Sequence, residues 1–234
     1  MGEVSQAEGF RYSNMPLDCA RDPLWKADFA LEEGGIRLSN SRLKRVVDVV
    51  GAGLGLLFLA PFLLLVAVLI RLESPGPSLF RQRRTGLNGA TFIIYKFRTM
   101  EVLEDGPIVN QATRRDCRAT GFGRFLRKTS IDELPNLINV LKGEMSLVGP
   151  RPHAVAHDRH WATVAAGYDG RFRAKPGITG LAQVEGFRGE MLNTESVAAR
   201  VAYDLQYIRD WSVALDLKIL LRTLMIGPFD PAAY

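Results

Sequence analysis

Cysteine and histidine are scarce in this sequence, and the scarcity argues against several classes of protein. The 234 residues include two cysteines, Cys19 and Cys117, and three histidines. Two cysteines outside any known motif argue against a disulfide framework and fit a reducing compartment. The first 30 residues also lack a basic start followed by an apolar run, so we expect no signal peptide.

Acidic side chains are few in one part of the chain, although the formal net charge of the whole is only +5. Residues 41–100 carry nine basic and two acidic side chains, whereas residues 1–40 carry four basic and seven acidic ones. This distribution suggests an anionic partner, and nucleic acid, anionic lipid and phosphorylated substrates all fit it. With 47% hydrophobic and 24% charged residues, the chain is too apolar to be disordered and too charged for a polytopic membrane protein.

A run of 22 residues without a charged side chain, residues 49–70, lies inside this basic window. About 20 apolar residues in a helix cross the hydrocarbon core of a bilayer. The alternative is a buried helix of a soluble protein, but such a helix normally has polar positions. We therefore predict a membrane-associated helix over residues 41–73.

Two features distinguish this segment from a straight spanning helix. Pro61, near its middle, removes a backbone donor and bends or breaks a helix. Basic residues flank the segment on both sides, and the positive-inside rule places both flanks in the cytoplasm. These residues are Arg42, Lys44, Arg45, Arg71, Arg81, Arg83 and Arg84. A re-entrant helix bent at Pro61 fits better than a spanning one, which stays open as the alternative.

The remaining pattern predicts an α+β fold that is mainly helical, with a small cytoplasmic domain over residues 74–234. Residues 79–83 and 91–97 are predicted strands of a β-hairpin, because the intervening residues 86–89 include glycines and an asparagine that tolerate positive φ. Helical patterns follow within residues 122–141, 153–166 and 194–226, the last with a break near Trp211. A loop is expected over residues 101–115.

Three finer expectations concern the N-terminal extension, the entrance of the membrane-associated helix and the C-terminal helix. Residues 1–40 form an N-terminal extension, in which we expect a break at Gly34-Gly35. At the membrane entrance, we expect Asp48 to pair with Lys44 or Arg45 across one helical turn. Near the C-terminus, leucines share one face of an amphipathic helix that can lie on the membrane surface. They are Leu217, Leu220, Leu221 and Leu224.

The first candidate for chemistry is the adjacent carboxylate pair Asp132 and Glu133. One member of such a pair can act as a nucleophile or metal ligand while the other acts as a base or second ligand. The alternative is a capping box, in which Ser130 and Glu133 begin a helix. Pro135 fits the first helical position best, which places both carboxylates at a helix entrance, where phosphate can also bind.

Basic residues in turn-like segments form the second candidate group. Guanidinium groups bind phosphate through two parallel hydrogen bonds, and the prolines on both sides of Arg151 restrict its backbone. For each such residue, the alternative is a solvated surface charge. The predicted phosphate-binding residues are Arg98, Arg118, Arg127, Arg151, Arg173 and Lys175.

The three histidines form a third, weaker candidate group. His153, His157 and His160 have spacings that place them on one face of a helix, as metal ligands require. No cysteine or clear fourth ligand accompanies them, so an ordinary polar helix face is the favoured interpretation and a pH-sensitive contact is a further one. No nucleotide-binding glycine loop is evident.

Five segments, taken in order, resemble the bacterial sugar transferases, specifically the small monotopic polyprenyl-phosphate glycosyl-1-phosphate transferases. The resemblance runs from Lys44 to about Leu224. The segments are KRVVD at 44–48, YKFRTM at 95–100, LRKTSIDELP at 126–135, GEMSLVGPRP at 143–152 and KPGITG at 175–180. The family bends its membrane helix at a Ser-Pro pair, whereas this chain has Ala60-Pro61.

The resemblance implies transfer of a sugar-1-phosphate from a nucleotide diphosphate sugar, usually UDP-linked, to undecaprenyl phosphate, with release of UMP. It implies Asp132 as the nucleophile that forms a phosphosugar intermediate, and Mg²⁺ as the cofactor at Asp132 and Glu133. Glu133 would bind Mg²⁺ or activate the acceptor, and Arg127 and Arg151 would hold phosphates. It also implies that the protein begins exopolysaccharide or other glycan assembly at the cytoplasmic face of the bacterial inner membrane.

Two other classes of function stay open from the sequence. A catalytically silent membrane adaptor could bind nucleotide sugars or glycan-assembly partners, although the intact carboxylate pair argues against it. A membrane-anchored nucleic-acid binder accounts for the basic window but not for its position beside an apolar segment, so we expect no nucleic-acid partner. The sequence is also compatible with a homo-oligomer.

Overall fold

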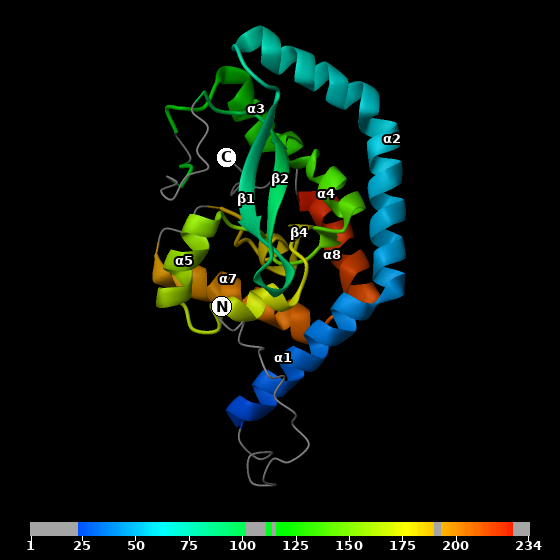
Figure 1. Ribbon diagram of the computed structural model, residues 1–234, viewed down its shortest axis with the longest axis vertical. Helices are drawn as coiled ribbons and strands as arrows, with labels where there is room; N and C mark the ends of the chain where they lie inside the picture. The colour runs from blue at the N-terminus through cyan, green and yellow to red at the C-terminus, as the bar shows by residue number, and fades with distance from the viewer. Residues whose placement is uncertain (1–22, 102–110, 114–115, 190–192, 227–234) are drawn as a thin grey trace, which may run out of the picture.

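Two long helices joined at Ser41 form one side of the molecule. The computed structural model describes residues 23–101, 111–113, 116–189 and 193–226 (Figure 1). Helix α1 (Pro23–Asn40) is followed directly by α2 (Arg42–Glu73), whose N-terminus is capped by the Ser41 side chain accepting from the Lys44 amide. Most of the predicted loop over residues 101–115 lies outside the described residues.

The expected break at Gly34-Gly35 is wrong, because both glycines lie inside α1. A Cβ added at Gly34 would clash with the carbonyl oxygen of Ile208 in helix α7 (Thr194–Arg209). Glycine is therefore needed here for close approach of two helices rather than for a turn. The chain leaves the helical conformation instead at Ser41, the N-cap of α2, whose backbone is extended.

Helix α2 runs without interruption for 32 residues and contains Pro61. By length and composition it can cross a membrane. Figure 1 shows that its axis changes direction in the upper part of the molecule, as expected for a helix with an internal proline. Many of its apolar side chains, among them Leu57, Phe58 and Leu64, are exposed rather than packed on the domain.

The predicted hairpin is confirmed as strands β1 (Leu79–Thr85) and β2 (Thr91–Phe97). They pair antiparallel, with Leu79 opposite Phe97 and Thr85 opposite Thr91. The connection is a 3₁₀ turn, η3 (Leu87–Gly89), in which Asn88 has a φ of 54°. Asn88 and Gly89 thus adopt the positive φ that the sequence predicted for this turn, whereas Gly86 has a φ of −114°.

Short helices follow the hairpin and carry the carboxylate pair. They are α3 (Gly121–Thr129), the 3₁₀ turn η4 (Ile131–Glu133) and α4 (Asn136–Lys142). A second sheet, which the sequence pattern did not predict, pairs β3 (Ser146–Val148) with β4 (Gly177–Thr179) in parallel. A strand of three residues is too short for the alternation of apolar and polar residues to be recognised in the sequence.

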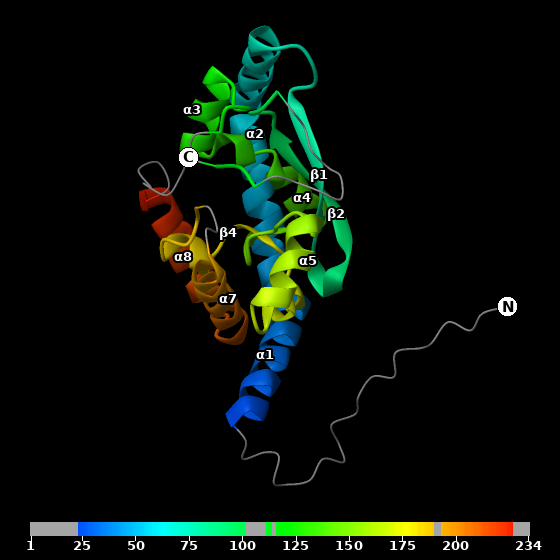
Figure 2. The same cartoon turned by 90° about the vertical axis from the view of Figure 1, so that its left-hand side faces the viewer.

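The remaining elements complete a mainly helical α+β fold. In chain order they are α5 (Val155–Val164), η5 (Tyr168–Arg173), α6 (Leu181–Val184), α7 and α8 (Val213–Ile226). The predicted break near Trp211 is confirmed by the end of α7 at Arg209 and the start of α8 at Val213. Figure 2 shows α7 and α8 on one side and the hairpin on the other, with α2 between them in this view.

A buried polar network fastens the start of α2 to the domain. Lys44 Nζ lies 2.8 Å from Asp216 Oδ2 and donates to the carbonyl oxygen of Val148 at 3.0 Å and to the Tyr207 hydroxyl at 3.1 Å. The Lys44 and Asp216 side chains are both buried. The cation therefore joins α2 to strand β3 and to helices α7 and α8 at a single point.

The expected pairing of Asp48 with Lys44 or Arg45 is wrong. Asp48 Oδ1 accepts hydrogen bonds from the Ser146 hydroxyl and the Leu147 amide, both at 2.9 Å. Arg45 donates instead to carbonyl oxygens at the C-terminal end of α4. A pair across one helical turn is a weak surface interaction, whereas buried polar groups take their partners from the fold that encloses them.

Lys44→Met should lower the free energy of unfolding by about 3–5 kcal/mol, because it leaves the Asp216 carboxylate buried without its cationic partner. Arg42→Met is the matched control, since Arg42 is exposed on the same helix turn and should change stability by no more than about 0.5 kcal/mol. Thermal unfolding in detergent micelles measures both variants, and equal Tm values would contradict the assignment.

Candidate active site

The carboxylate pair lies in a sharp turn between two helices. Ser130 ends α3 in the left-handed region with a φ of 59°, and Asp132 and Glu133 follow in η4. The Ser130 side chain makes no capping hydrogen bond, so the capping-box interpretation is wrong. Pro135 occupies the N-cap of α4, and the carboxylates therefore precede that helix, as the position of the proline predicted.

Glu133 is held by two cationic side chains. Its Oε1 lies 2.8 Å from Lys96 Nζ and 2.7 Å from Arg151 Nη2, and its Oε2 accepts from Arg151 Nη1 at 3.0 Å. Glu133 is buried, and burial alone would raise its pKa. The neighbouring charges of Arg151 and Lys96 outweigh that effect and hold the pKa of Glu133 well below its usual value. Glu133 is thus a fixed anion.

Asp132 is in a different electrostatic state from its neighbour. Loss of solvent and the adjacent charge of Glu133 raise its pKa to about 6, against the opposing charges of Lys96, Arg151 and Arg127. Within the described part of the chain, its carboxylate has no hydrogen-bond partner. Asp132 is therefore a carboxylate with a raised pKa and no hydrogen-bond partner among the described residues, in a site rich in cations.

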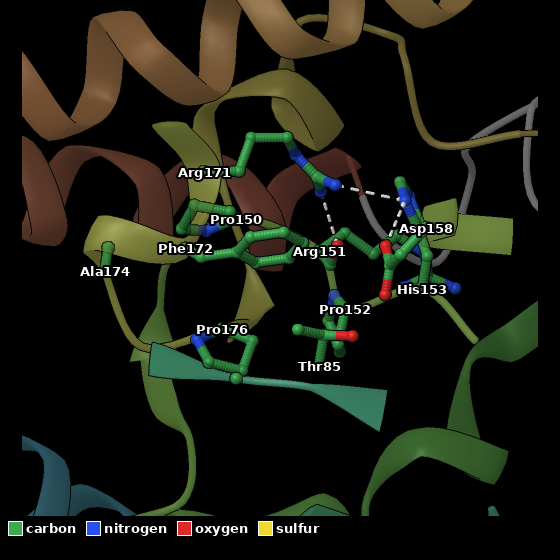
Figure 3. A pocket seen from close by; sticks show the side chains of 11 residues that line it. Thr85, Pro150, Arg151, Pro152, His153, Asp158, Arg171, Phe172, Ala174 and Pro176 are labelled. Carbon is green, nitrogen blue, oxygen red and sulfur yellow. Dashed lines mark hydrogen bonds and ion pairs between the residues drawn. The ribbon is translucent and has the colours of Figure 1, made fainter. Parts of the chain in front are cut away.

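Arg151 is fixed by its backbone as well as by Glu133. Pro150 and Pro152 restrict its main chain, and Arg171 Nη2 donates to its carbonyl oxygen at 2.6 Å. Arg171 is buried and its Nε donates to Asp204 Oδ2 at 2.7 Å. Figure 3 shows Arg171 reaching the Arg151 backbone beside a small pocket. An ion pair between η5 and α7 thus supports the turn that carries Arg151.

Two of the six predicted phosphate-binding residues lie beside the carboxylate pair. Arg151 contacts Glu133, and the charge of Arg127 in the last turn of α3 acts on Asp132. A third cation, Lys96, was missed by the sequence reasoning, although it lies within the YKFRTM segment. The sequence offers little reason to place Lys96 in the site, because a lysine in a hairpin strand normally lies on an exposed edge of the sheet.

The other four lie elsewhere in the fold. Arg98 is buried and donates to the carbonyl oxygens of Ile70, Ser74 and Pro75, so it caps the C-terminus of α2. Because backbone carbonyls hold its guanidinium, it is not presented to a phosphate at the pair. Arg118 pairs with Asp116, Arg173 reaches the Asp28 carbonyl oxygen, and Lys175 lies near Gly143 and Arg45.

The histidines do not form a shared helical face. His153 precedes α5, and its Nδ1 lies 2.6 Å from the Tyr168 hydroxyl and 3.1 Å from Arg171 Nη1. Burial and the neighbouring arginines lower its pKa well below the usual value, so it is neutral. Across the described residues, no group of three or more histidine, cysteine or acidic side chains is placed to hold a metal ion.

The pair itself can serve as part of a magnesium site. Mg²⁺ is typically bound by one or two carboxylates together with substrate phosphates and water. Asp132 supplies a carboxylate without a described partner, and Glu133 Oε2 accepts one hydrogen bond, which leaves a lone pair. These donors fit a magnesium ion that a diphosphate substrate also coordinates.

The structure thus brings together a carboxylate without a hydrogen-bond partner among the described residues and a second carboxylate held by two cations, in a chain with a helix long enough to cross a membrane. The bacterial sugar transferase family profile matches residues 39–228. The chain belongs to the bacterial sugar transferase family.

Three relatives illustrate the similarity. The UDP-glucose:undecaprenyl-phosphate glucose-1-phosphate transferase of Caulobacter vibrioides is 58% identical over 181 residues, 77% of this chain and 68% of the relative. The Escherichia coli K12 protein of the same name is 50% identical over 83% of this chain but only 42% of its own length. The exopolysaccharide production protein PSS of Rhizobium leguminosarum is 44% identical over 78% of this chain and 94% of the relative.

Arg151→Met should raise the pKa of Asp132 above 6, because it removes a cation that favours the ionised carboxylate. Protonation then occurs at higher pH, and less of the group is ionised at pH 7. Infrared or carboxyl ¹³C NMR titration of aspartate-labelled protein measures this shift. Arg173→Met is the control and should leave the titration unchanged; an unshifted midpoint in Arg151→Met would refute the electrostatic account.

Proposed function

We propose that this protein is a polyprenyl-phosphate glycosyl-1-phosphate transferase. It transfers a sugar-1-phosphate from a UDP-sugar to undecaprenyl phosphate, giving undecaprenyl-diphosphate-sugar and UMP, and so begins exopolysaccharide or other glycan assembly. The observation that carries the proposal is the position of Asp132, which has no hydrogen-bond partner among the described residues, beside a Glu133 that anchors two cations. The names of the relatives, two of which specify UDP-glucose and undecaprenyl phosphate, support the substrate classes.

In the first step, an Asp132 carboxylate oxygen attacks the sugar-bearing phosphorus of the donor. A bond forms between that oxygen and phosphorus, and the bond from phosphorus to the bridging oxygen breaks. UMP leaves with the electron pair, and the sugar phosphate stays on Asp132. Two anions must approach each other here, and Arg127, Arg151 and Lys96 supply the positive charge that offsets their repulsion.

In the second step, an oxygen of the lipid phosphate attacks the same phosphorus. The bond between phosphorus and Asp132 breaks, and the carboxylate is restored. A covalent intermediate lets a water-soluble donor and a lipid acceptor use one site in turn. Glu133 is a positioning residue in both steps, because its charge fixes Arg151 and Lys96 and keeps the pKa of Asp132 raised.

Asp132 and Glu133 would hold Mg²⁺ together with the donor diphosphate. When bound, the ion supplies neutralisation of charge on the diphosphate and on the departing UMP. The carboxylates would provide the protein ligands, and Arg127 and Arg151 would bind the phosphate oxygens that remain.

Helix α2 would anchor the protein in the bacterial inner membrane, with residues 74–234 forming the catalytic domain on the cytoplasmic face and residues 1–40 an extension of it. The exposed apolar side chains of α2 and its internal Pro61 support a re-entrant helix. Both flanks of the helix contact the folded domain, since Lys44 pairs with Asp216 and Arg98 caps its end. Both ends of α2 can contact the same domain only if they lie on the same side of the membrane, as in a re-entrant helix.

Release of UMP tests the activity directly. Purified full-length protein in nanodiscs, with undecaprenyl phosphate and Mg²⁺, should release UMP from at least one member of a UDP-sugar panel that includes UDP-glucose. Omission of undecaprenyl phosphate should prevent continued turnover. An absence of UMP release with every donor of a panel covering the common bacterial UDP-sugars would refute the proposal in favour of a silent adaptor.

Asp132→Asn should reduce turnover by roughly 10³-fold or more, as expected when a nucleophile is removed. Its Tm should stay equal or rise, because the substitution removes a desolvated carboxylate beside Glu133. Steady-state UMP release and thermal unfolding give the two readouts. Retained turnover would exclude Asp132 as the nucleophile, and a lower Tm would contradict its electrostatic description.

Cysteine labelling tests the topology of α2. Leu43→Cys and Leu72→Cys place thiols at exposed positions near its two ends, in a chain whose Cys19 and Cys117 are first replaced by serine. A membrane-impermeant maleimide should label both positions in inverted inner-membrane vesicles and neither in intact spheroplasts. Labelling of one position from outside would mean a spanning helix.

A further inference from the structure

A cavity of about 260 Å³ lies beside the carboxylate pair. It is lined by Ser130 and Glu133, from the turn that also carries Asp132. It is also lined by Leu224 and Ile226, from the last turn of α8. The cavity therefore connects the proposed reaction site to the C-terminal end of a helix that is distant in sequence.

The lining combines apolar and polar side chains. Leu134, Ile178 and Val184 are apolar, and the polar residues Thr129, Thr179, Gln183 and Thr223 also line the cavity. Arg188 is a further lining residue, and its guanidinium donates to the Ser130 hydroxyl. A cation beside the turn that carries the carboxylates, together with apolar side chains, matches an amphiphile that has an anionic head.

The apolar surface continues outside the cavity along α8. Leu217, Leu221 and Leu224 are 51%, 60% and 76% exposed and follow one another at helical spacing. The buried side of the same helix is formed by Asp216 and Ile219. A hydrocarbon chain leaving the cavity at Leu224 would thus pass onto an exposed apolar helix face rather than into water.

We propose that this cavity binds the first isoprene units of the acceptor polyprenyl phosphate. The phosphate lies toward Arg188 and Asp132, and the rest of the chain leaves along α8 into the bilayer. The inference rests on the proposed function and assigns a place to one of its substrates. This volume lies just below the usual range for pockets that hold a whole ligand, so the cavity accepts a segment of the lipid rather than a whole nucleotide sugar.

Leu224→Asn tests the assignment, with Met225→Asn as the matched control. Both residues are exposed in the last turn of α8, but Leu224 lines the cavity and Met225 does not. Leu224→Asn should raise the KM for undecaprenyl phosphate about tenfold, the value of one large apolar contact, and leave the KM for the UDP-sugar unchanged. Met225→Asn should change neither constant by more than about twofold.

The outcomes separate the subsite from the activity. Equal changes in the two variants would overturn the subsite and indicate a general role of α8 in membrane contact, and a raised donor KM alone would assign the cavity to the nucleotide sugar. If the wild-type protein turned over no donor at all, the proposed function would fail while the binding test below still decided the subsite.

Photo-crosslinking provides that test without turnover. Undecaprenyl phosphate with a diazirine in its first isoprene unit, added to wild-type protein in nanodiscs, should label peptides that contain residues 178–184 or 224–226. Unlabelled undecaprenyl phosphate should compete, and undecaprenol should compete less well because it lacks the anionic head. Labelling confined to α2 or to the outer face of α8 would overturn the proposal.

Discussion

One carboxylate, Glu133, organises the cations around the proposed nucleophile. Lys96 comes from the hairpin and Arg151 from a turn between two prolines, and both donate to Glu133. Breaking either contact would leave a buried charge without its partner, which is costly in a protein interior. The hairpin, the α3–α4 turn and the Arg151 turn are therefore fixed relative to one another by a single anion, and Asp132 takes its environment from that arrangement.

Buried polar contacts of the same kind join the site to helix α2. Lys44 connects α2 to Asp216, Tyr207 and the Val148 carbonyl oxygen, and Asp48 connects it to strand β3. Strand β3 leads directly into the Pro150–Pro152 turn, and its partner β4 leads into α6, which lines the cavity proposed for the acceptor. Helix α2 and the proposed reaction site are thus joined through one small sheet, which fixes the position of one relative to the other.

Much of this could be predicted from the sequence, because the signals were local. The apolar run, the hairpin, the α7–α8 break and the adjacent carboxylates each depend on neighbouring residues. Partners from distant segments were not predictable in this way. Asp48 accepts from β3 rather than pairing with Lys44, and Arg98 caps the C-terminus of α2. His153 contacts the Tyr168 hydroxyl, and Lys96 donates to Glu133 from a strand. Each of these partners comes from a distant segment that the folded chain brings close, which local sequence patterns do not show.

The most direct test of the central claim is the mass of the Asp132 peptide after incubation with donor alone. Wild-type protein given UDP-sugar and Mg²⁺ without undecaprenyl phosphate, then quenched in acid and digested, should carry one hexosyl phosphate on the peptide containing Asp132. An equimolar burst of UMP should accompany it. UMP formed only in the presence of the acceptor, with an unmodified Asp132 peptide throughout, would contradict a covalent intermediate on this residue.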